Sequence, residues 1–322
     1  MNIVNFSAKY MPQDWTRDGI YKQIEQAGRT CYKSEDKITE DSPKAFVYRM
    51  IKSGHLSMLE HGTVYLAIPI TTYAPDAVNF YYNNPYSKVN KCDEFIFKDK
   101  YGDKVATWCV TTNFRFIVEN NLLEDLEFLC EPTTYHAKRY SIKLTTNIGI
   151  TREGNRHRQS IAEESTRYCN YSKDKFGNDI TIVPPIWIAH TDHIHSKKEN
   201  ITNLGYIIDD IISETPISAS DIEAYFATIE FCGIMYNHLL DCGWTPQQAR
   251  EVLPLATKSD VVYTKFEDEW EHFFDLRLVG ITGKPHPNIQ HCAALIINEF
   301  YKNEIYISNY ELYHYYASKL KI

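Results

Sequence analysis

Hydrophobic residues recur every three to four positions in several segments, which is the pattern of helices that bury one face. The predicted helices span residues 17–31, 42–54, 121–130, 220–243, a stretch opening at Thr245, and 289–300. Capping residues mark two of them. Ser42 precedes Pro43 at the start of one, and Ser220 with Glu223 forms a capping box at the start of another.

Alternating apolar and polar residues predict strands over residues 63–70, within 105–118, and from 140 to about 149. Residues 71–103 are polar and aromatic, and they predict an irregular excursion. Residues 171–200, with Gly177 and two prolines, predict a loop. Helices and strands do not alternate strictly, so the predicted fold class is α+β, with a mixed β-sheet flanked by helices.

Composition and charge narrow the function. The 322 residues carry 34 basic and 42 acidic side chains, a net charge of −8, which argues against a general nucleic-acid binder. The N-terminus lacks the pattern of a signal peptide, and no apolar run is long enough to span a membrane. The eight cysteines form no C-x-x-C pair, so we expect a cytoplasmic protein with reduced thiols.

The strongest chemical signal is a cluster of arginines at positions 152, 156, 158 and 167. Arginine forks suit phosphate oxygens, and a bound anion would relieve the repulsion among these side chains. The cluster is expected just beyond a strand and at the start of a helix. On such a helix, Glu163 and Arg167 could instead form a plain surface ion pair, and His157 alone would more often be structural.

Four segments in order resemble the signature blocks of the flavin-dependent thymidylate synthases. They are Gly54-His55-x-Ser57-x-x-Glu60-His61, Arg156-His157-Arg158 followed by Ser165-x-Arg167-Tyr168, Ala249-Arg250-x-x-Leu253-Pro254, and Trp270-x-His272-Phe273-Phe274-x-Leu276-Arg277. The spacer between Arg158 and Ser165 is one residue shorter than is usual in that family. Relative to compact members of that family, residues 71–135 look like an insertion into a single domain that spans residues 1–322.

The resemblance implies a set of site residues. Those that would contact FAD are Ser57, Arg156, His157, Arg158, Glu163 and His272. Those that would contact dUMP are Glu153, Arg156, Ser165, Thr166, Arg167, Arg250 and Arg277. It also implies that methylenetetrahydrofolate donates the carbon, that NADPH reduces the flavin, that no metal is required, and that a homotetramer shares its active sites between subunits.

The implied catalytic residue is Arg277, which would polarise the uracil ring. A cation beside the ring carbonyl stabilises the negative charge that develops when C5 becomes nucleophilic. Classical thymidylate synthases use a cysteine for this step. Cys169 and Cys292 do not lie in that setting here, and both are expected to be ordinary buried thiols.

Two alternatives remain open from the sequence. His190, His193 and His195, with Asp192 between them, could bind a divalent metal and support hydrolysis. Their spacing matches no established helical metal motif, however. The arginine cluster could also serve a nucleotide-binding module without catalysis, in which case the other three blocks would be coincidences.

Overall fold

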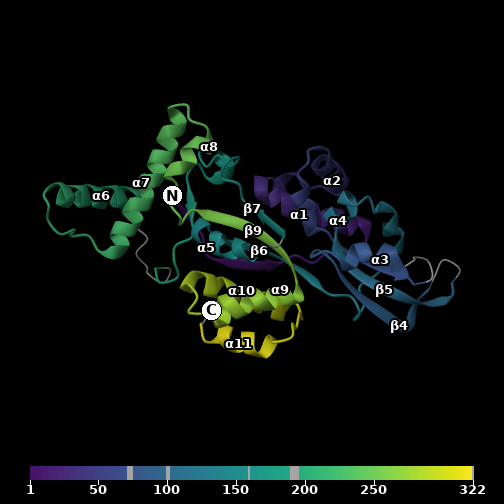
Figure 1. Cartoon of the computed structure of the whole chain (residues 1–322). Helices are drawn as coiled ribbons and strands as arrows, with labels where there is room; N and C mark the ends of the chain where they lie inside the picture. The colour runs from purple at the N-terminus through teal and green to yellow at the C-terminus, as the bar shows by residue number, and fades with distance from the viewer. Residues whose placement is uncertain (71–74, 99–101, 159, 189–195, 321–322) are drawn as a thin grey trace.

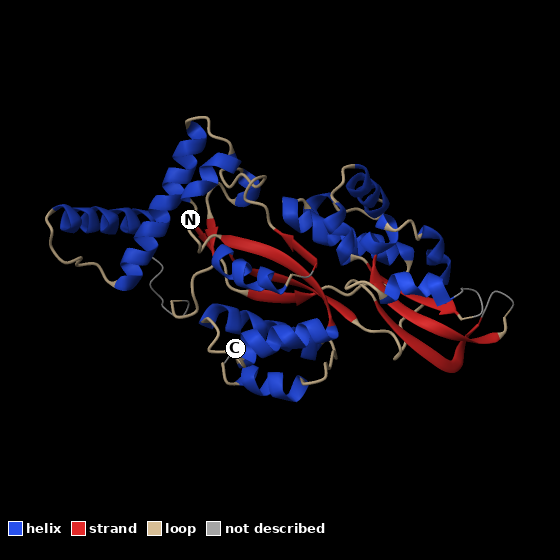
Figure 2. Cartoon of the chain, in the orientation of Figure 1, coloured by secondary structure: helices blue, strands red, loops and turns tan. Residues whose placement is uncertain are grey.

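The elements lie along an elongated molecule, with a central sheet between an inserted region at one end and a helical arm at the other (Figure 1). This is a computed structural model, and it describes the chain except for residues 71–74, 99–101, 159, 189–195 and 321–322. Helices and strands both contribute, so the α+β class is confirmed (Figure 2). Among the described residues, parallel pairing occurs only between β1 (Asn2–Ile3) and β8 (Thr181–Ile182).

The central sheet has four antiparallel strands in the order β2-β6-β9-β7. They are β2 (Ser7–Tyr10), β6 (Arg139–Asn147), β9 (Lys258–Phe266) and β7 (Ser160–Glu163). Strands β6 and β9 pair along nine residues, from Arg139 opposite Phe266 to Asn147 opposite Lys258. This ladder holds together the segments that lead into the sequence motifs.

Both faces of the central sheet are covered by helices. One face packs Ile142 and Tyr263 against α9 (Glu267–Phe274), α10 (Pro287–Lys302) and α11 (Tyr310–Ser318). The other face packs Val262 against Ala27 of α1 (Arg17–Tyr32). Side chains alternate across a strand, so neighbouring residues of β9 serve different layers.

The predicted insertion, residues 71–135, supplies two strands, β4 and β5, of a second antiparallel sheet in the order β3-β5-β4. The sheet consists of β3 (Thr63–Pro69), β5 (Lys104–Asn113) and β4 (Lys88–Lys98), next to α2 (Ser42–Lys52), α3 (Pro75–Tyr82) and α4 (Phe114–Glu119). The prediction of an irregular segment over 71–103 was therefore wrong for α3 and β4. Ladder bonds to β5 stabilise β4, whose sequence shows little alternation.

The helical arm consists of α6 (Lys197–Ile212) and α7 (Asp221–Asp241), with α8 (Pro246–Ala249) beyond. Helix α7 begins at the predicted capping box of Ser220 and Glu223. Helix α6 was missed by the loop prediction over 171–200, although Ser196 and Glu199 form a second capping box. No helix of the described chain is long and apolar enough to cross a membrane.

The remaining short elements connect these layers. They are η1 (Glu35–Lys37), η2 (Leu56–His61), η3 (Leu123–Phe128), α5 (Ile148–Gly154), η4 (Asn155–His157), η5 (Asp174–Phe176), η6 (Arg250–Val252) and the π-helix η7 (Asp275–Val279). The helices predicted over 17–31, 42–54 and 289–300 are confirmed. Helix α11, in the tyrosine-rich C-terminal run, was not predicted.

A group of buried charges joins α1 to the central sheet. Asp260 of β9 forms ion pairs with Lys33 and with Lys258, the latter at 2.7 Å, while Glu164 lies 2.9 Å from Lys258. Burial alone would raise the pKa of Asp260, but the two lysines outweigh it and hold this pKa below its ordinary value. Opposite charges therefore compensate one another where water is excluded.

Replacing Asp260 with Asn is expected to lower the free energy of unfolding at neutral pH by about 3–5 kcal/mol, because Lys33 and Lys258 would lose a buried partner. In the wild-type protein this stabilisation is present above the unfolded carboxyl pKa. It is lost as the pH falls through the lowered folded pKa, so stability should drop below about pH 4.

Urea unfolding at neutral and acidic pH measures both effects. Asp36→Asn is the matched control, because Asp36 pairs with Lys175 at the exposed surface and its loss should change little. An Asp260→Asn protein as stable as the wild type, with the same loss of stability in acid, would contradict this account.

Candidate functional site

An anchored arginine lies at the centre of the motif-bearing segments. Arg277 donates from Nε to Nε2 of His157 at 3.1 Å, from Nη2 to the carbonyl oxygen of Glu153 at 3.2 Å, and from Nη1 to the Glu153 carboxylate at 3.4 Å. Its side chain is only 17% exposed. A guanidinium has five N–H donors, so these three bonds fix its plane and leave two N–H groups for a ligand.

His157 is held as a neutral hydrogen-bond acceptor. The ring is buried, and it contacts Phe273 edge-on at 5.0 Å and His272 at 5.7 Å between centroids. Burial is the main reason that its pKa falls to about 3, with further lowering by Lys265, Arg277 and His272. Because Nε2 accepts from Arg277, the proton of the neutral ring must lie on Nδ1.

The secondary structure explains how these distant residues meet. Asn147 ends β6 and caps α5, which leads directly into η4 and His157. On the other side, β9 is followed by α9, which packs back on the sheet and continues into the π-helix η7 with Arg277. Single π-turns within helices are often found at functional sites, because they shift the side chains of one turn.

The arginines of the sequence cluster, unlike Arg277, are exposed to solvent. Arg152, Arg156 and Arg158 are exposed, and none has a described ion-pair partner. Arg158 adopts a left-handed conformation with φ of 47°, which is uncommon for a residue other than glycine. Arg152 lies within α5, and the Arg-His-Arg motif that follows it leads into strand β7, so the prediction that the motif opens a helix was wrong.

Glu163, at the end of β7, accepts hydrogen bonds from neighbouring side chains. It accepts a hydrogen bond from Nδ2 of Asn155 at 2.8 Å and from Oγ of Ser259 at 3.2 Å. It lies in a strand, so the proposed helical ion pair with Arg167 does not form. Ser57, at the start of η2, is exposed and has no described hydrogen bond to the Arg277 group.

A second group of predicted site residues gathers after β7. Thr166 accepts from Nη1 of Arg250 at 3.3 Å, and Arg167 donates from Nε to Gln247 at 2.9 Å. Ser165 turns the chain, because its Oγ accepts from the backbone N–H of Arg167. The described contacts do not join this group directly to Arg277, so these residues form two separate hydrogen-bonded groups.

Burial makes Cys169 and Cys292 unsuited to act as nucleophiles. It raises the pKa of both Cys169 and Cys292 to about 12, so both thiols are protonated at neutral pH. This confirms that they are ordinary buried thiols. The described residues contain no group of side chains suited to a metal ion, while His190, His193 and His195 lie outside the described residues.

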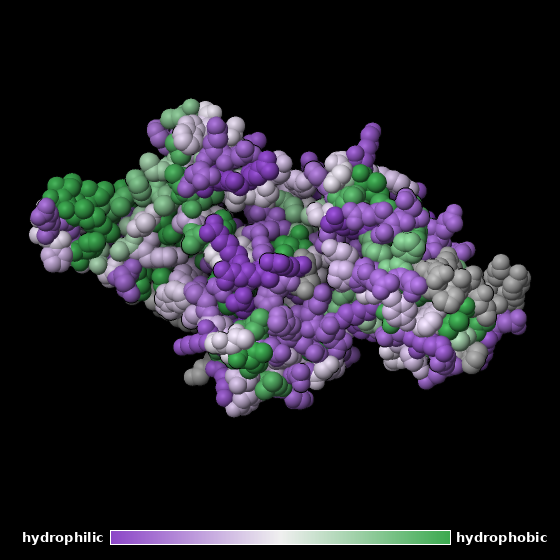
Figure 3. All heavy atoms as spheres, viewed as in Figure 1, coloured by the Kyte–Doolittle hydropathy of each residue, from purple (hydrophilic) through white to green (hydrophobic). Residues whose placement is uncertain are grey.

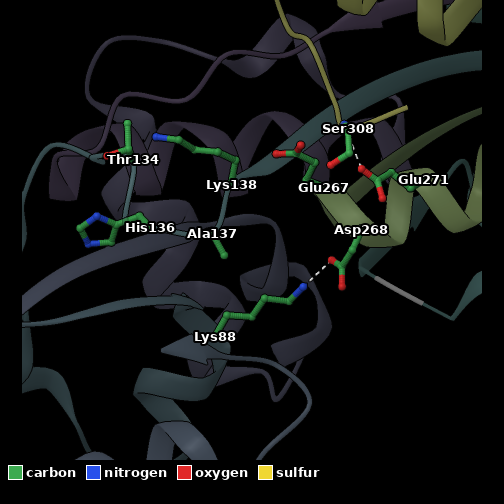
Figure 4. Close-up of a pocket in the computed structure, with 9 residues that line it drawn as sticks. All are labelled: Lys88, Thr134, His136, Ala137, Lys138, Glu267, Asp268, Glu271 and Ser308. Atoms are coloured by element: carbon green, nitrogen blue, oxygen red, sulfur yellow. Dashed lines mark hydrogen bonds and ion pairs between the residues drawn. The ribbon is translucent and has the colours of Figure 1, made fainter. Parts of the chain in front are cut away.

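Another cavity, of about 430 Å³, lies where the inserted region meets α9 (Figure 4). Lys88 pairs there with Asp268, while Lys138, Glu267 and Glu271 add further charges. Burial, and then Glu271 and Asp268, raise the pKa of Glu267. None of the motif arginines lines this cavity, so it is a charged junction apart from the candidate site.

The sequence analysis missed a buried lysine beside the Arg277 group. Lys265 is fully buried, and its ammonium lies 5.3 Å from the Tyr263 ring and 5.7 Å from the Trp270 ring. Burial lowers its pKa to about 7, partly offset by Glu269. A lysine at a core-facing position of a strand that also holds Val261 and Tyr263 was the available signal. Asn155 and Gln247 carried no comparable signal.

The site combines anchored and exposed guanidinium groups on an α+β scaffold, and such groups are chemically suited to phosphorylated ligands. The family model described as thymidylate synthase complementing protein matches residues 131–303, more than half of the chain. The chain therefore belongs to this family, the flavin-dependent thymidylate synthases, and is an enzyme of that family. The matched range contains every predicted site residue except Ser57.

Individual relatives are distant. A probable flavin-dependent thymidylate synthase of Paramecium bursaria Chlorella virus 1 is 25% identical over 162 residues, which are 50% of this chain and 67% of the relative. A UMP/dUMP methylase, PolB from Streptomyces cacaoi, bound with 5-Br dUMP, has a TM-score of 0.40 at 15% identity, covering 94% of this chain and 93% of that one. Thymidylate synthase X from Helicobacter pylori, with FAD and dUMP, has a TM-score of 0.37 at 13% identity, covering 99% of both chains. The family assignment rests on the family model.

The hydrogen bond from Arg277 predicts the protonation state of His157. With selective ¹⁵N-histidine labelling, its ring is expected to stay neutral, with the proton on Nδ1, from about pH 8 down to about pH 5. The other histidines of the same sample serve as the comparison. A His157 ring that titrates near its ordinary pKa, or that carries its proton on Nε2, would show that Arg277 is not held in this way.

Proposed function

We propose that this enzyme methylates dUMP to dTMP, with methylenetetrahydrofolate as the carbon donor and FAD as a cofactor that NADPH reduces. The observation that carries the proposal is the anchored guanidinium of Arg277. It lies in the family's matched range, beside the Arg-His-Arg motif, while burial keeps the thiols of Cys169 and Cys292 protonated.

Arg277 is the proposed catalytic residue. Glu153 and His157 hold its guanidinium in one plane, and the two remaining N–H groups can donate to a uracil carbonyl. Donors that are fixed in advance stabilise the charge that develops on the ring without a reorganisation cost. The neutrality of His157 matters because an imidazolium could not accept from Arg277.

The side chains fit a dinucleotide cofactor with a pyrophosphate. Arg152, Arg156 and Arg158 are exposed cations without described partners, and their charge suits a pyrophosphate. We propose that Ser57, Arg156, His157, Arg158, Glu163 and His272 make up the FAD side of the site. When bound, FAD would supply the hydride that completes the methyl group.

The second polar group is proposed to bind dUMP. Ser165, Thr166, Arg167 and Arg250 offer hydroxyl, backbone N–H and guanidinium donors, which suit a phosphate monoester. Glu153, Arg156 and Arg277 would complete the set. No hydrogen bond or ion pair given for the described residues joins the two groups, which supports a site shared between subunits.

We infer that the active enzyme is a homotetramer in the cytoplasm. Isoleucines of α6 lie at the surface, and Figure 3 shows hydrophobic side chains gathered over this arm. Ile212 is 75% exposed, and Ile201, Ile208 and Ile211 are also exposed. A second copy of this chain is the proposed partner, because an apolar helix face left in water favours association.

A metal-dependent hydrolase is the weaker alternative. It rests on His190, His193 and His195, and these lie outside both the described residues and the four matching sequence blocks. The family match also disfavours a nucleotide-binding module without catalysis.

Arg277→Ala should retain FAD but lose methylation. Loss of a fixed charged donor costs about 10²–10³-fold in turnover, while FAD binding should change little because Arg277 is not among its proposed contacts. FAD absorbance, its shift on adding dUMP, and dTMP formation test this. Arg277→Lys is the matched variant that keeps the charge without the fork. Activity within a few-fold of the wild type would refute the role of Arg277, and a wild-type protein that takes up no FAD would refute the proposed function.

Ile212→Glu should weaken the oligomer. A charge placed in an apolar contact is costly to desolvate, so light scattering should show smaller species than the wild-type tetramer, with the folded monomer preserved. Leu123→Glu is the control, since Leu123 is similarly exposed but lies in the inserted region. A wild-type monomer with full activity would exclude the shared site, and an unchanged tetramer in Ile212→Glu would exclude this face.

A further inference from the structure

A cavity of about 240 Å³ lies between the inserted region and the edge of the central sheet. The inserted region contributes Tyr86 and Asn113, the sheet contributes Arg139 and Phe266, and the Arg-His-Arg motif contributes Arg158. The family match begins at residue 131, so Tyr86 and Asn113 lie outside the segment that the family shares. The cavity therefore joins a motif residue to a wall that lies outside the matched range.

Arg139 is the buried cation of this cavity. Its side chain donates to Oγ1 of Thr63 and Oγ of Ser160, both at 3.2 Å, and its guanidinium lies over the Phe266 ring at 5.2 Å. The residue is only 9% exposed, and its Nε has no hydrogen-bond partner among the described residues. A buried, incompletely paired guanidinium is costly unless a ligand completes its bonding.

Tyr86 is placed to cover a bound ring. Its backbone is fixed on both sides, because its N–H donates to Oδ1 of Asn84 at 2.8 Å and its carbonyl accepts from Thr112 at 3.4 Å. The side chain itself is 52% exposed while lining the cavity. An aromatic side chain on a fixed backbone provides a stacking surface at low entropic cost.

The cavity also presents two carboxylates, which suit a ligand group that donates hydrogen bonds rather than a phosphate. Glu60 pairs through Oε1 with Arg115 at 2.7 Å, and Glu269 accepts through Oε2 from the backbone N–H of Phe266 at 2.7 Å. The second oxygen of each makes no described hydrogen bond. These oxygens can accept from ribose hydroxyls or from the amino group of a purine.

The size of the cavity limits its occupant to one end of a larger molecule. A cavity of about 150 Å³ holds a benzene-sized ring, whereas whole drug-sized ligands need about 300–1,000 Å³. The cavity also lies on the Thr264 and Phe266 side of β9, whereas His157 and Arg277 lie on the Tyr263 side. A single ring therefore cannot lie both in this cavity and beside Arg277.

We propose that this cavity holds the adenine end of FAD, stacked on Tyr86 of the inserted region, with Arg139 as the buried cation beside it. The inserted region is thereby part of the cofactor site, and it determines how tightly the non-reacting end of the cofactor is held. This inference rests on the proposed function, since it requires that the enzyme bind FAD.

Tyr86→Ala tests the proposal with the full-length protein. The side chain is half exposed and its backbone bonds remain, so the fold should be retained. The dissociation constant for FAD, from flavin fluorescence, should rise roughly tenfold, as is typical when one stacked base loses its aromatic partner. Tyr86→Phe keeps the ring and should bind like the wild type. Tyr48→Ala removes a similarly exposed tyrosine away from the cavity and is the control.

Two further titrations identify the occupant. FMN lacks the adenylate half, so its binding should be equal in wild type and Tyr86→Ala, or too weak to detect in both. The affinity for dUMP should also be equal. An unchanged FAD affinity in Tyr86→Ala overturns the proposal, as does an equal loss of FAD and FMN binding or a loss confined to dUMP. If the wild type binds no FAD at all, the proposed function itself fails, which this comparison separates from a failure at Tyr86.

Discussion

The pairing of β6 with β9 is the constraint on which the rest of the structure depends. Nine opposed residues fix the two strands, and a shift by one residue would turn every side chain to the other face. The strands end at opposite sides of the sheet, and each continues into a helix that packs back on it. Glu153 and His157 of one return path thereby meet Arg277 of the other, about 120 residues later.

Burial decides what the polar groups of this site can do. His157 and Lys265 are buried, so their pKa values fall and the imidazole can accept a hydrogen bond from Arg277. Asp260 is equally buried, but two lysines hold it charged. The first arrangement orients the guanidinium of Arg277, the proposed catalytic residue, whereas the second fastens α1 to the sheet. The same physical effect therefore serves chemistry in one place and stability in another.

The inserted region changes the surroundings of the Arg-His-Arg motif. Arg158 is an exposed cation that lines the same cavity as Tyr86 and Asn113 of the inserted region. Arg139, the first residue of β6, is the point where the inserted region rejoins the sheet. The inserted region thus lines a cavity beside the motif without contributing a residue to the Arg277 group.

The sequence by itself determined the local features: the helices with capping residues, the strands with alternation, the α+β class and the motifs that indicate the family. Capping and alternation are read from neighbouring residues, so they need no tertiary information. It did not reveal β4, whose ladder bonds come from β5, or the strand that follows Arg158 in place of a helix. Nor could it show that His157 anchors Arg277, that Lys265 lies beside them, or that Tyr86 and Arg139 line one cavity. Only the tertiary structure decided these contacts, because burial and long-range hydrogen bonds depend on how distant strands and helices pack.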